Sequence, residues 1–357
     1  MPTYCGTDFH ARQQVIAWCD TTNGEIHNTQ LKHQSQEEVR KFYKELSQPV
    51  IVGLEASGYS SWFEKLLTNL GCEIWIGNAT EIRARARARQ KTDRRDAELL
   101  LDLLLKGEFP RVHRPSLESM EVLRQLRYRH KLVKHRTMIK NSLQALALGA
   151  GLSRQTKLLT KTGRKKLMEL ELSPAQQDQR TTWLELLELF DKRIILVEQL
   201  LDLVAQADPR VERVRTHPGI GLLSGLALVH TLCPVTRFDN SRKVVAYVGL
   251  EPREYSSGER QRFGSISKQG SRLLRFLLGE AAKSNIHRKG GDPQLKRLYS
   301  RVQHRRDKAK ATVAAARHLL VHTFVMLRDE IDYAEFCRRG VAVESARTKH
   351  RPQVPGV

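Results

Sequence analysis

The first hundred residues alternate short apolar runs with amphipathic stretches, a pattern that predicts a mixed α/β fold. The expected strands cover residues 4–8, 13–19, 25–31, 49–55 and 73–76. The expected helices cover residues 35–46, 59–69 and 93–105. Asn23 and Gly24 supply a hairpin turn between the second and third strands.

This order of elements is that of an RNase H-like fold: three strands joined by turns, then helix, strand, helix, strand, helix. In such a fold the end of the first strand lies beside the end of the fourth, and a late helix approaches the same place. Asp8 and Glu55 end those two strands, while Asp93 and Asp96 begin the late helix. We therefore expect the four carboxylates to meet.

The middle of the chain is predicted to be helical, beginning with one long basic helix or a helix pair over residues 117–148. Apolar residues then recur at alternating steps of four and three, as in a coiled coil. They are Trp183, Leu187, Phe190, Ile194, Val197, Leu201 and Val204. This seam packs either within the chain or against another subunit, and we expect the second arrangement.

The C-terminal part is expected to be mostly helical. Residues 216–221 resemble a helix-hairpin-helix turn, whose glycines would leave backbone N–H groups for a phosphate. Residues 277–327 read as further helices. His318 and His322 are one helical turn apart and either bind a metal or lie on a plain helix surface. We expect the plain surface, because no acid or cysteine accompanies them.

The expected domains follow from these patterns. They are an RNase H-like domain at residues 1–112, a basic helical or coiled-coil region at 113–207, a mostly helical domain at 208–335, and a disordered basic tail at 336–357.

Charge points to the partner. The 357 residues include 61 Lys and Arg against 39 Asp and Glu, a formal net charge of +22. Such an excess predicts a polyanion, either nucleic acid or an anionic membrane surface. No apolar run of about 18 residues and no signal-peptide pattern is present. We therefore expect a cytoplasmic nucleic-acid-binding protein that acts at the nucleoid and not at a membrane. Its five cysteines form no CxxC pair and read as reduced thiols.

Asp93 and Asp96 lie on one helix face, with Cβ atoms roughly 5–6 Å apart. Two such carboxylates can hold a hard divalent cation, although acids at a helix start are also favoured by the helix dipole alone. Asp8 can likewise cap a turn, and Glu55 can be a solvated strand end. Nearby basic side chains either bind phosphates or are simply solvated. The candidates are Arg83, Arg85, Arg87, Arg89, Lys91, Arg94 and Arg95, followed by Arg124, Arg127, Lys131 and Lys134 on the long helix.

A second candidate site lies at residues 252–275. A serine beside a glycine offers an exposed hydroxyl, and surrounding cations can hold a phosphodiester and stabilise charge during attack. These cations are Arg253, Arg260, Arg262, Lys268, Arg272 and Arg275. The alternative is a polar loop with scattered arginines.

Three features together resemble the DEDD transposases of the IS110/IS1111 insertion-sequence family. They are Asp8 after a short strand, the Gly-Leu-Glu-Ala-Ser-Gly run at residues 53–58, and the Lys-Thr-Asp-Arg-Arg-Asp-Ala run at residues 91–97. Residues 252–275 resemble the family's second characteristic region, including a Lys-x-Gly-x-x-x-Leu-Arg pattern at residues 268–275.

The resemblance implies a RuvC-like domain in which Asp8, Glu55, Asp93 and Asp96 bind Mg²⁺. It implies that Ser257 attacks a DNA phosphodiester and forms a phosphoserine link, with the neighbouring Ser256 remaining open as the nucleophile. It further implies a transposase that recombines donor and target DNA, guided by a structured non-coding RNA from its own element. We expect it to work as a dimer or tetramer joined through the helical region.

Two other functions stay open from the residues themselves. One is a Holliday-junction-resolving nuclease that uses the four acids and water. The other is a non-enzymatic nucleic-acid-binding scaffold.

Overall fold

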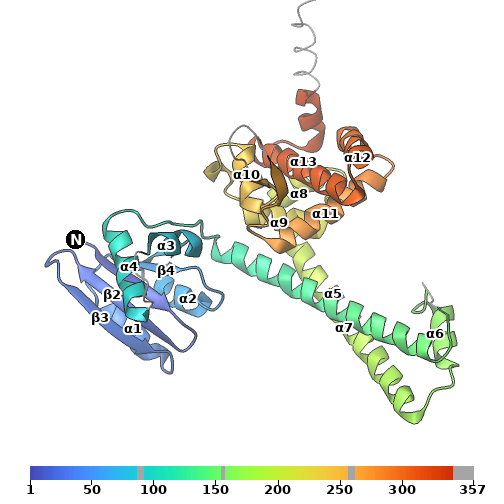
Figure 1. The fold of residues 1–357 in the computed structure, drawn as a ribbon, viewed down its shortest axis with the longest axis horizontal. Helices are drawn as coiled ribbons and strands as arrows, with labels where there is room; N and C mark the ends of the chain where they lie inside the picture. Colours follow the sequence, from blue (N-terminus) through green and yellow to red (C-terminus); the bar gives the residue numbers. More distant parts are fainter. Residues whose placement is uncertain (87–91, 154–156, 256–261, 341–357) are drawn as a thin grey trace, which may run out of the picture. The chain divides into compact units, whose positions relative to one another are not determined.

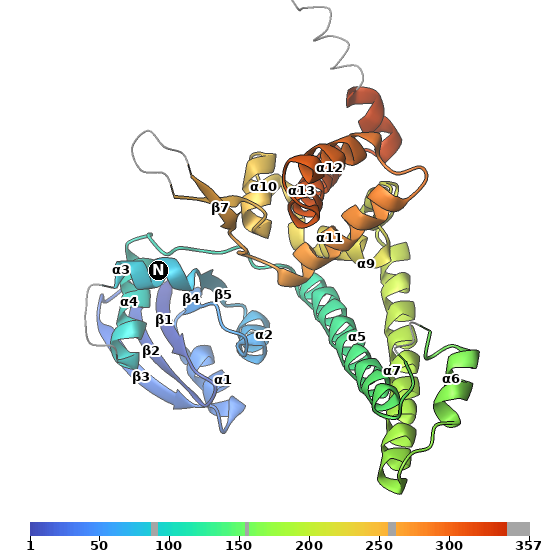
Figure 2. The same cartoon turned by 45° about the vertical axis from the view of Figure 1, so that its right-hand side comes forward.

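A computed structural model describes residues 1–86, 92–153, 157–255 and 262–340, and the chain divides into two compact units, Met1–Arg114 and Pro115–Val357. Figures 1 and 2 show the elements of each unit. Several predicted site residues lie outside the described residues, and so does the tail from 341 onward. They are Arg87, Arg89, Lys91, Ser256, Ser257 and Arg260.

The first unit is built on a five-stranded sheet of order β3-β2-β1-β4-β5. Its strands are β1 (Thr3–Phe9), β2 (Gln13–Asp20), β3 (Ile26–Lys32), β4 (Val50–Glu55) and β5 (Glu73–Gly77). The first three strands are antiparallel, whereas β4 is parallel to both β1 and β5. All five predicted strands are therefore confirmed, and the mixed α/β character of this part with them.

The helices of this unit are α1 (Gln36–Glu45), α2 (Ser61–Asn69), α3 (Ala79–Arg85) and α4 (Asp93–Leu105). Three were predicted, but the short α3 was not. Asn78 starts α3 by accepting a hydrogen bond from the Thr80 amide at 3.1 Å. In the same way, the Ser35 and Thr92 hydroxyls cap α1 and α4.

The sheet has a core on each face, because alternate residues of β1 and β4 point to opposite sides. Val52 and Leu54 join Tyr43 of α1 and Phe63 of α2 in one buried cluster. The opposite face is covered by α4, whose Leu101 packs beside strand residues of β2. The Figure 2 view shows α4 on one side of the sheet and α1 and α2 on the other.

Two glycines let α4 approach the sheet. Gly6 of β1 pairs in register with Gly53 of β4. A Cβ at Gly6 would clash with the Leu101 amide nitrogen and the Ala97 carbonyl oxygen. A Cβ at Gly53 would lie 2.8 Å from the Phe109 ring. At Gly6 the helix backbone therefore occupies the space of a side chain, whereas at Gly53 the side chains of Leu104 and Phe109 occupy it.

The second unit begins with a helical hairpin of α5 (Leu117–Gly149) and α7 (Pro174–Gln206), with α6 (Lys161–Met168) between them. The predicted heptad seam of α7 packs within the chain: Leu187, Ile194, Val197 and Leu201 are buried in clusters that include α5 residues. The expectation that this seam pairs with another subunit is therefore wrong.

Ion pairs also join the two long helices. The guanidinium of Arg129 donates to Glu198 at 2.8 Å, and Arg136 donates to Asp191 at 3.1 Å. These two arginines belonged to the basic stretch predicted on α5. They face α7 instead of presenting their charge to solvent.

The remaining elements form a helical bundle with one small hairpin. The helices are α8 (Pro209–Arg215), α9 (Leu222–Leu232), α10 (Ser241–Val248), α11 (Arg272–His287), α12 (Pro293–Arg305) and α13 (Lys308–Arg328). The hairpin strands are β6 (Pro252–Glu254) and β7 (Phe263–Ile266), which the sequence pattern did not predict. One hydrophobic cluster contains residues from α5, α7 and this bundle, so the helical hairpin of α5 and α7 shares a core with the bundle.

Gly6→Ala should lower the free energy of unfolding by about 3 kcal/mol or more, because the new methyl group meets helix backbone that cannot rotate away. Chemical denaturation of the full chain measures this loss. Gly58→Ala is the control, since nothing lies within 4 Å of a Cβ there. An equal effect of the two substitutions would contradict the close approach of α4.

Candidate functional site

The four predicted acids lie at one edge of the sheet of the first unit. Thr7 pairs with Leu54 across the parallel strands β1 and β4, so Asp8 and Glu55 follow at the same end of neighbouring strands. Both share the face of Gly6 and Gly53, which is the face that α4 covers. Asp93 and Asp96 stand in the first turn of α4.

A histidine stands between two of these acids. The Nε2 atom of His10 lies 3.0 Å from Asp8 Oδ2 and 3.6 Å from Asp93 Oδ1. The donor atoms of the three residues all lie within 4.8 Å of one another, a spacing that can hold a metal ion. The sequence analysis did not identify His10. The available signal was its position two residues after Asp8, just beyond the end of β1.

The electrostatics of Asp8 reflect this crowding. Burial raises the pKa of the Asp8 carboxyl, and the charges of Asp96 and Asp93 raise it further, against the opposing effect of His10. The side chain is only 15% exposed, whereas that of Asp93 is 48% exposed. An ionised Asp8 is therefore held at a cost in free energy that a bound cation would offset.

Glu55 has a cationic partner of its own. Arg83 donates from Nη2 to Glu55 Oε1 at 3.2 Å. Arg94 is occupied in the same manner by Glu98 at 2.9 Å, and Arg85 donates to the Glu108 carbonyl. All three guanidinium groups remain exposed at the surface, and so does Arg95.

The four candidate cations of α5 share an exposed face of the helix. Arg124, Arg127, Lys131 and Lys134 recur at steps of three and four and are all exposed. Arg124 also pairs with Glu121 at 2.8 Å. This face remains accessible to a polyanion within the second unit.

The segment around the candidate serine is described on both flanks. Arg253, Arg262, Lys268 and Arg272 are exposed. Arg253 donates to the Ser267 carbonyl at 3.2 Å. Arg275 donates to the carbonyls of Val248 and Gln269, so its guanidinium fastens this segment to α10.

The turn between α8 and α9 does not offer the amides that a phosphate needs. The Ile220 amide donates to the His217 carbonyl, and the Gly221 amide donates to Ser224 Oγ. Gly219 has a φ of +91° and packs against α11, where a Cβ would lie 2.8 Å from Asn285. The expectation that this turn presents its N–H groups to a phosphate is therefore corrected for the Ile220 and Gly221 amides, and Gly219 serves close packing on α11.

The interpretation of His322 as part of a plain helix surface is wrong. His322 of α13 is buried beside His217 and Asp292, whereas His318 is exposed. The sequence analysis found no acidic partner for His322, because Asp292 and His217 come from distant parts of the chain. No local pattern in the sequence signalled this cluster.

Asp8→Asn should raise the melting temperature of the metal-free protein at neutral pH. A carboxyl whose folded pKa is raised binds more protons in the folded state, so its contribution to stability falls as pH rises through that pKa. The variant has no charge at this position and so avoids this loss of stability. The melting temperatures of the native protein and the variant should therefore converge as the pH falls. Magnesium should raise the melting temperature of the native protein but not that of the variant.

Asp102→Asn on the same helix is the control for thermal unfolding, since Asp102 is exposed and pairs with Lys106. A lower melting temperature of metal-free Asp8→Asn, or an unchanged response to magnesium, would contradict the claim that an ionised Asp8 destabilises the metal-free fold.

Among the described residues, no helix combines the length and apolar character needed to cross a membrane.

Comparison with known proteins gives a consistent result along most of the chain. Residues 5–150 match the model of DEDD transposases of the IS110 type, and residues 211–300 match the model described as Transposase IS116/IS110/IS902 family. A probable family 20 transposase of Pseudomonas aeruginosa is 28% identical, over 70% of this chain and 75% of its own length. The transposase for insertion sequence element IS1111A of Coxiella burnetii is 27% identical, over 74% of each chain.

The two matched regions contain, respectively, the four acids and the segment around the candidate serine. The chain therefore belongs to the IS110-type family of insertion-sequence transposases, enzymes that act on DNA.

Proposed function

We propose that this transposase cuts and rejoins donor and target DNA by phosphodiester transesterification. Its first unit is a RuvC-like, RNase H-like domain with a Mg²⁺ site, and its second unit supplies a serine nucleophile. The observation that carries the proposal is the meeting of Asp8, His10 and Asp93 within 4.8 Å, with Glu55 on the neighbouring parallel strand.

The donor set fits magnesium. Carboxylate oxygens are the ligands that this hard cation prefers, and it is usually held by few protein groups while keeping several waters. The raised pKa of Asp8 means that a neighbouring positive charge is favourable there. Asp8, Glu55, Asp93 and Asp96 would hold the ion. When bound, magnesium supplies positive charge that stabilises the phosphodiester oxygens during displacement.

The residues of the chain have separate roles around this cation. The acids fix its position at the strand ends, because their backbones belong to paired strands and to a docked helix. The His10 imidazole lies between Asp8 and Asp93 and can donate a hydrogen bond to a carboxylate. Exposed Arg94 and Arg95 lie beside the acids in the sequence and can contact DNA phosphates without reading bases.

The nucleophile is Ser257. Its Oγ attacks the phosphorus of a DNA phosphodiester, an Oγ–P bond forms, and the bond from phosphorus to the leaving DNA oxygen breaks. The serine proton leaves, and the departing DNA oxygen gains a proton to become a hydroxyl. The serine lies between β6 and β7 in the sequence. Arg253, Arg262 and Lys268 on the flanking segments can hold the backbone on which it acts.

Ser257→Ala should abolish strand exchange and the covalent protein–DNA link while DNA binding persists, because only the hydroxyl is lost. A recombination assay on supercoiled donor and target DNA, with denaturing gels to detect the adduct, measures both. Ser256→Ala is the matched control and should retain activity. Asp93→Asn should remove the metal-dependent reaction with Ser257 intact.

The same assay separates the other functions. Metal-dependent cleavage of branched DNA without any adduct would indicate a junction-resolving nuclease. DNA binding with neither cleavage nor metal dependence would indicate a scaffold. Recombination by Ser257→Ala at the native rate would exclude the serine as nucleophile.

A structured non-coding RNA from the element is the proposed guide. The family resemblance is its support, together with a net charge of +22, which suits the binding of several nucleic-acid backbones. Base pairing by the RNA would then select the donor and target sequences, while the protein holds backbones.

The active form is proposed to be a homo-oligomer joined through the outer face of α7. With its first seam buried against α5, this helix carries a second, exposed set of leucines at four-three spacing that Arg193 interrupts once. Its leucines are Leu186, Leu189, Leu196, Leu200 and Leu203, between 38% and 64% exposed. A second copy of the chain presents the same spacing, so two such faces complement each other as a coiled coil does.

Replacing Leu196 and Leu200 together by Glu should convert the oligomer to a monomer in sedimentation equilibrium, because two charges would be buried in the seam. Leu148→Glu places the same charge at an exposed leucine of α5 and should leave the mass unchanged. A native protein that is monomeric at micromolar concentration, or an unaffected double variant, would contradict the outer seam.

A further inference from the structure

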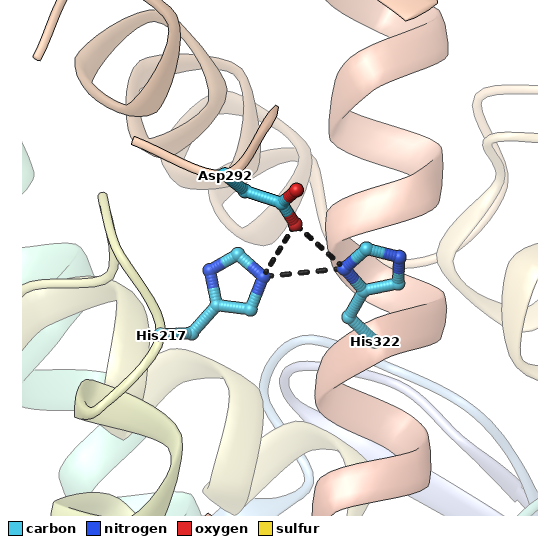
Figure 3. A group of neighbouring side chains, drawn as sticks. All are labelled: His217, Asp292 and His322. Carbon is cyan, nitrogen blue, oxygen red and sulfur yellow. Dashed lines mark hydrogen bonds and ion pairs between the residues drawn. The ribbon is translucent and has the colours of Figure 1, made fainter. Parts of the chain in front are cut away.

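Three buried polar side chains meet inside the helical bundle of the second unit, away from both proposed parts of the active site in the sequence. They are His217 from the turn after α8, Asp292 immediately before α12, and His322 of α13 (Figure 3). Their side chains are 0%, 3% and 9% exposed, respectively. The three segments are separated by 75 and 30 residues in the sequence, as 292 − 217 and 322 − 292.

The three facing atoms form a nearly equilateral triangle. His217 Nε2 lies 3.2 Å from His322 Nδ1 and 3.6 Å from Asp292 Oδ2, and His322 Nδ1 lies 3.3 Å from the same oxygen. Zinc bonds of about 2.0–2.1 Å in a tetrahedral site place neighbouring ligand atoms about 3.3–3.4 Å apart. The triangle therefore has the dimensions of one face of a zinc coordination tetrahedron.

The orientation of His217 leaves a lone pair directed into the triangle. Its Nδ1 lies 2.9 Å from the Pro218 carbonyl oxygen, which can only accept a hydrogen bond. The proton of a neutral ring is therefore on Nδ1, and Nε2 is unprotonated. A backbone carbonyl that fixes the second ring nitrogen is the usual outer contact of a metal-binding histidine.

Asp292 divides its two oxygens between two tasks. Its Oδ1 accepts the amide of Gln294 at 2.7 Å and so caps α12. Its Oδ2 faces the two imidazoles. The cap fixes the carboxylate independently of the histidines, which gives the cluster a preorganised anionic ligand.

Protons alone do not satisfy all three edges of the triangle. When His217 is neutral, its Nε2 carries no proton. A proton on His322 Nδ1 can point either to that nitrogen or to Asp292. In both cases a lone pair of His217 Nε2 faces a lone pair of Asp292 Oδ2, with no proton between them. A cation at the centre would satisfy the three donors at once.

We propose that His217 Nε2, Asp292 Oδ2 and His322 Nδ1 bind a structural zinc ion. Two imidazoles and one carboxylate favour zinc over magnesium, which prefers oxygen ligands alone. Tyr333 packs its ring on His217, and its hydroxyl interacts with both Asp292 and the Cys337 thiol, so these two side chains lie beside the proposed site. The ion would clamp the α8–α9 turn and the start of α12 to α13.

Zinc content and thermal stability of the untagged full-length protein test the proposal. The native protein should contain about one zinc ion per chain by plasma mass spectrometry, as expected for a three-residue site. Removing metal with a chelator should lower the melting temperature, and stoichiometric Zn²⁺ but not Mg²⁺ should restore it.

Variants locate the ion. His322→Ala and Asp292→Asn should lose the bound zinc, whereas His318→Ala, one turn away on the exposed side of α13, should retain it. Asp93→Asn should also retain it, which separates this site from the magnesium site. Circular dichroism confirms that each variant is folded.

Two results would overturn the proposal without reliance on any variant. One is a native protein that contains no zinc and takes up none when titrated with Zn²⁺ alone. The other is a zinc-containing protein whose melting temperature is unchanged by complete removal of the metal. Zinc retained by a folded His322→Ala would also exclude this site.

Discussion

The backbone of α4 lies directly against strand β1 at Gly6, where a Cβ would collide with the Leu101 amide nitrogen and the Ala97 carbonyl oxygen. At Gly53 of β4 the side chains of Leu104 and Phe109 fill the space that a Cβ would need. This close approach brings the first turn of α4 to the ends of β1 and β4. The positions of Asp93 and Asp96 beside Asp8 and Glu55 therefore depend on the missing methyl groups of two glycines.

The acids at this edge are held in an electrostatically unfavourable arrangement. A buried Asp8 with two further aspartates nearby has a raised pKa, and His10 only partly compensates. Such crowding is expected where a site is shaped for a cation and not for the stability of the chain alone. The buried triangle of the second unit has the opposite character, because imidazole nitrogens replace most of the carboxylate oxygens. The two clusters would therefore select different ions from the same solution.

The long helix α7 has to satisfy two apolar faces. The inner face is covered by α5, and ion pairs of Arg129 and Arg136 fix the alignment of the two helices. The outer leucines remain between 38% and 64% exposed. A helix of this kind suits a protein that works as several copies, since the fold of each copy is complete without the contact between copies.

The sequence alone determined the five strands of the first unit and most of the helices, because period-two and helical patterns are local and their caps lie beside them. It also indicated Asp8, Glu55, Asp93 and Asp96, because element order brings strand ends and a helix start together. It gave no signal for the contact of Gly6 with α4 or for the partner of the α7 seam. A heptad pattern indicates only that the helix packs against another helix, and it does not identify that helix.

Only the tertiary structure decided which distant side chains meet. His217 and His322 are 105 residues apart, and their approach to Asp292 depends on how α11, α12 and α13 pack. The glycines of the α8–α9 turn looked like phosphate ligands in the sequence, but Gly219 packs closely on α11 and the Gly221 amide donates to Ser224. Local patterns fix which elements form, whereas burial and long-range contacts fix which polar groups share a site.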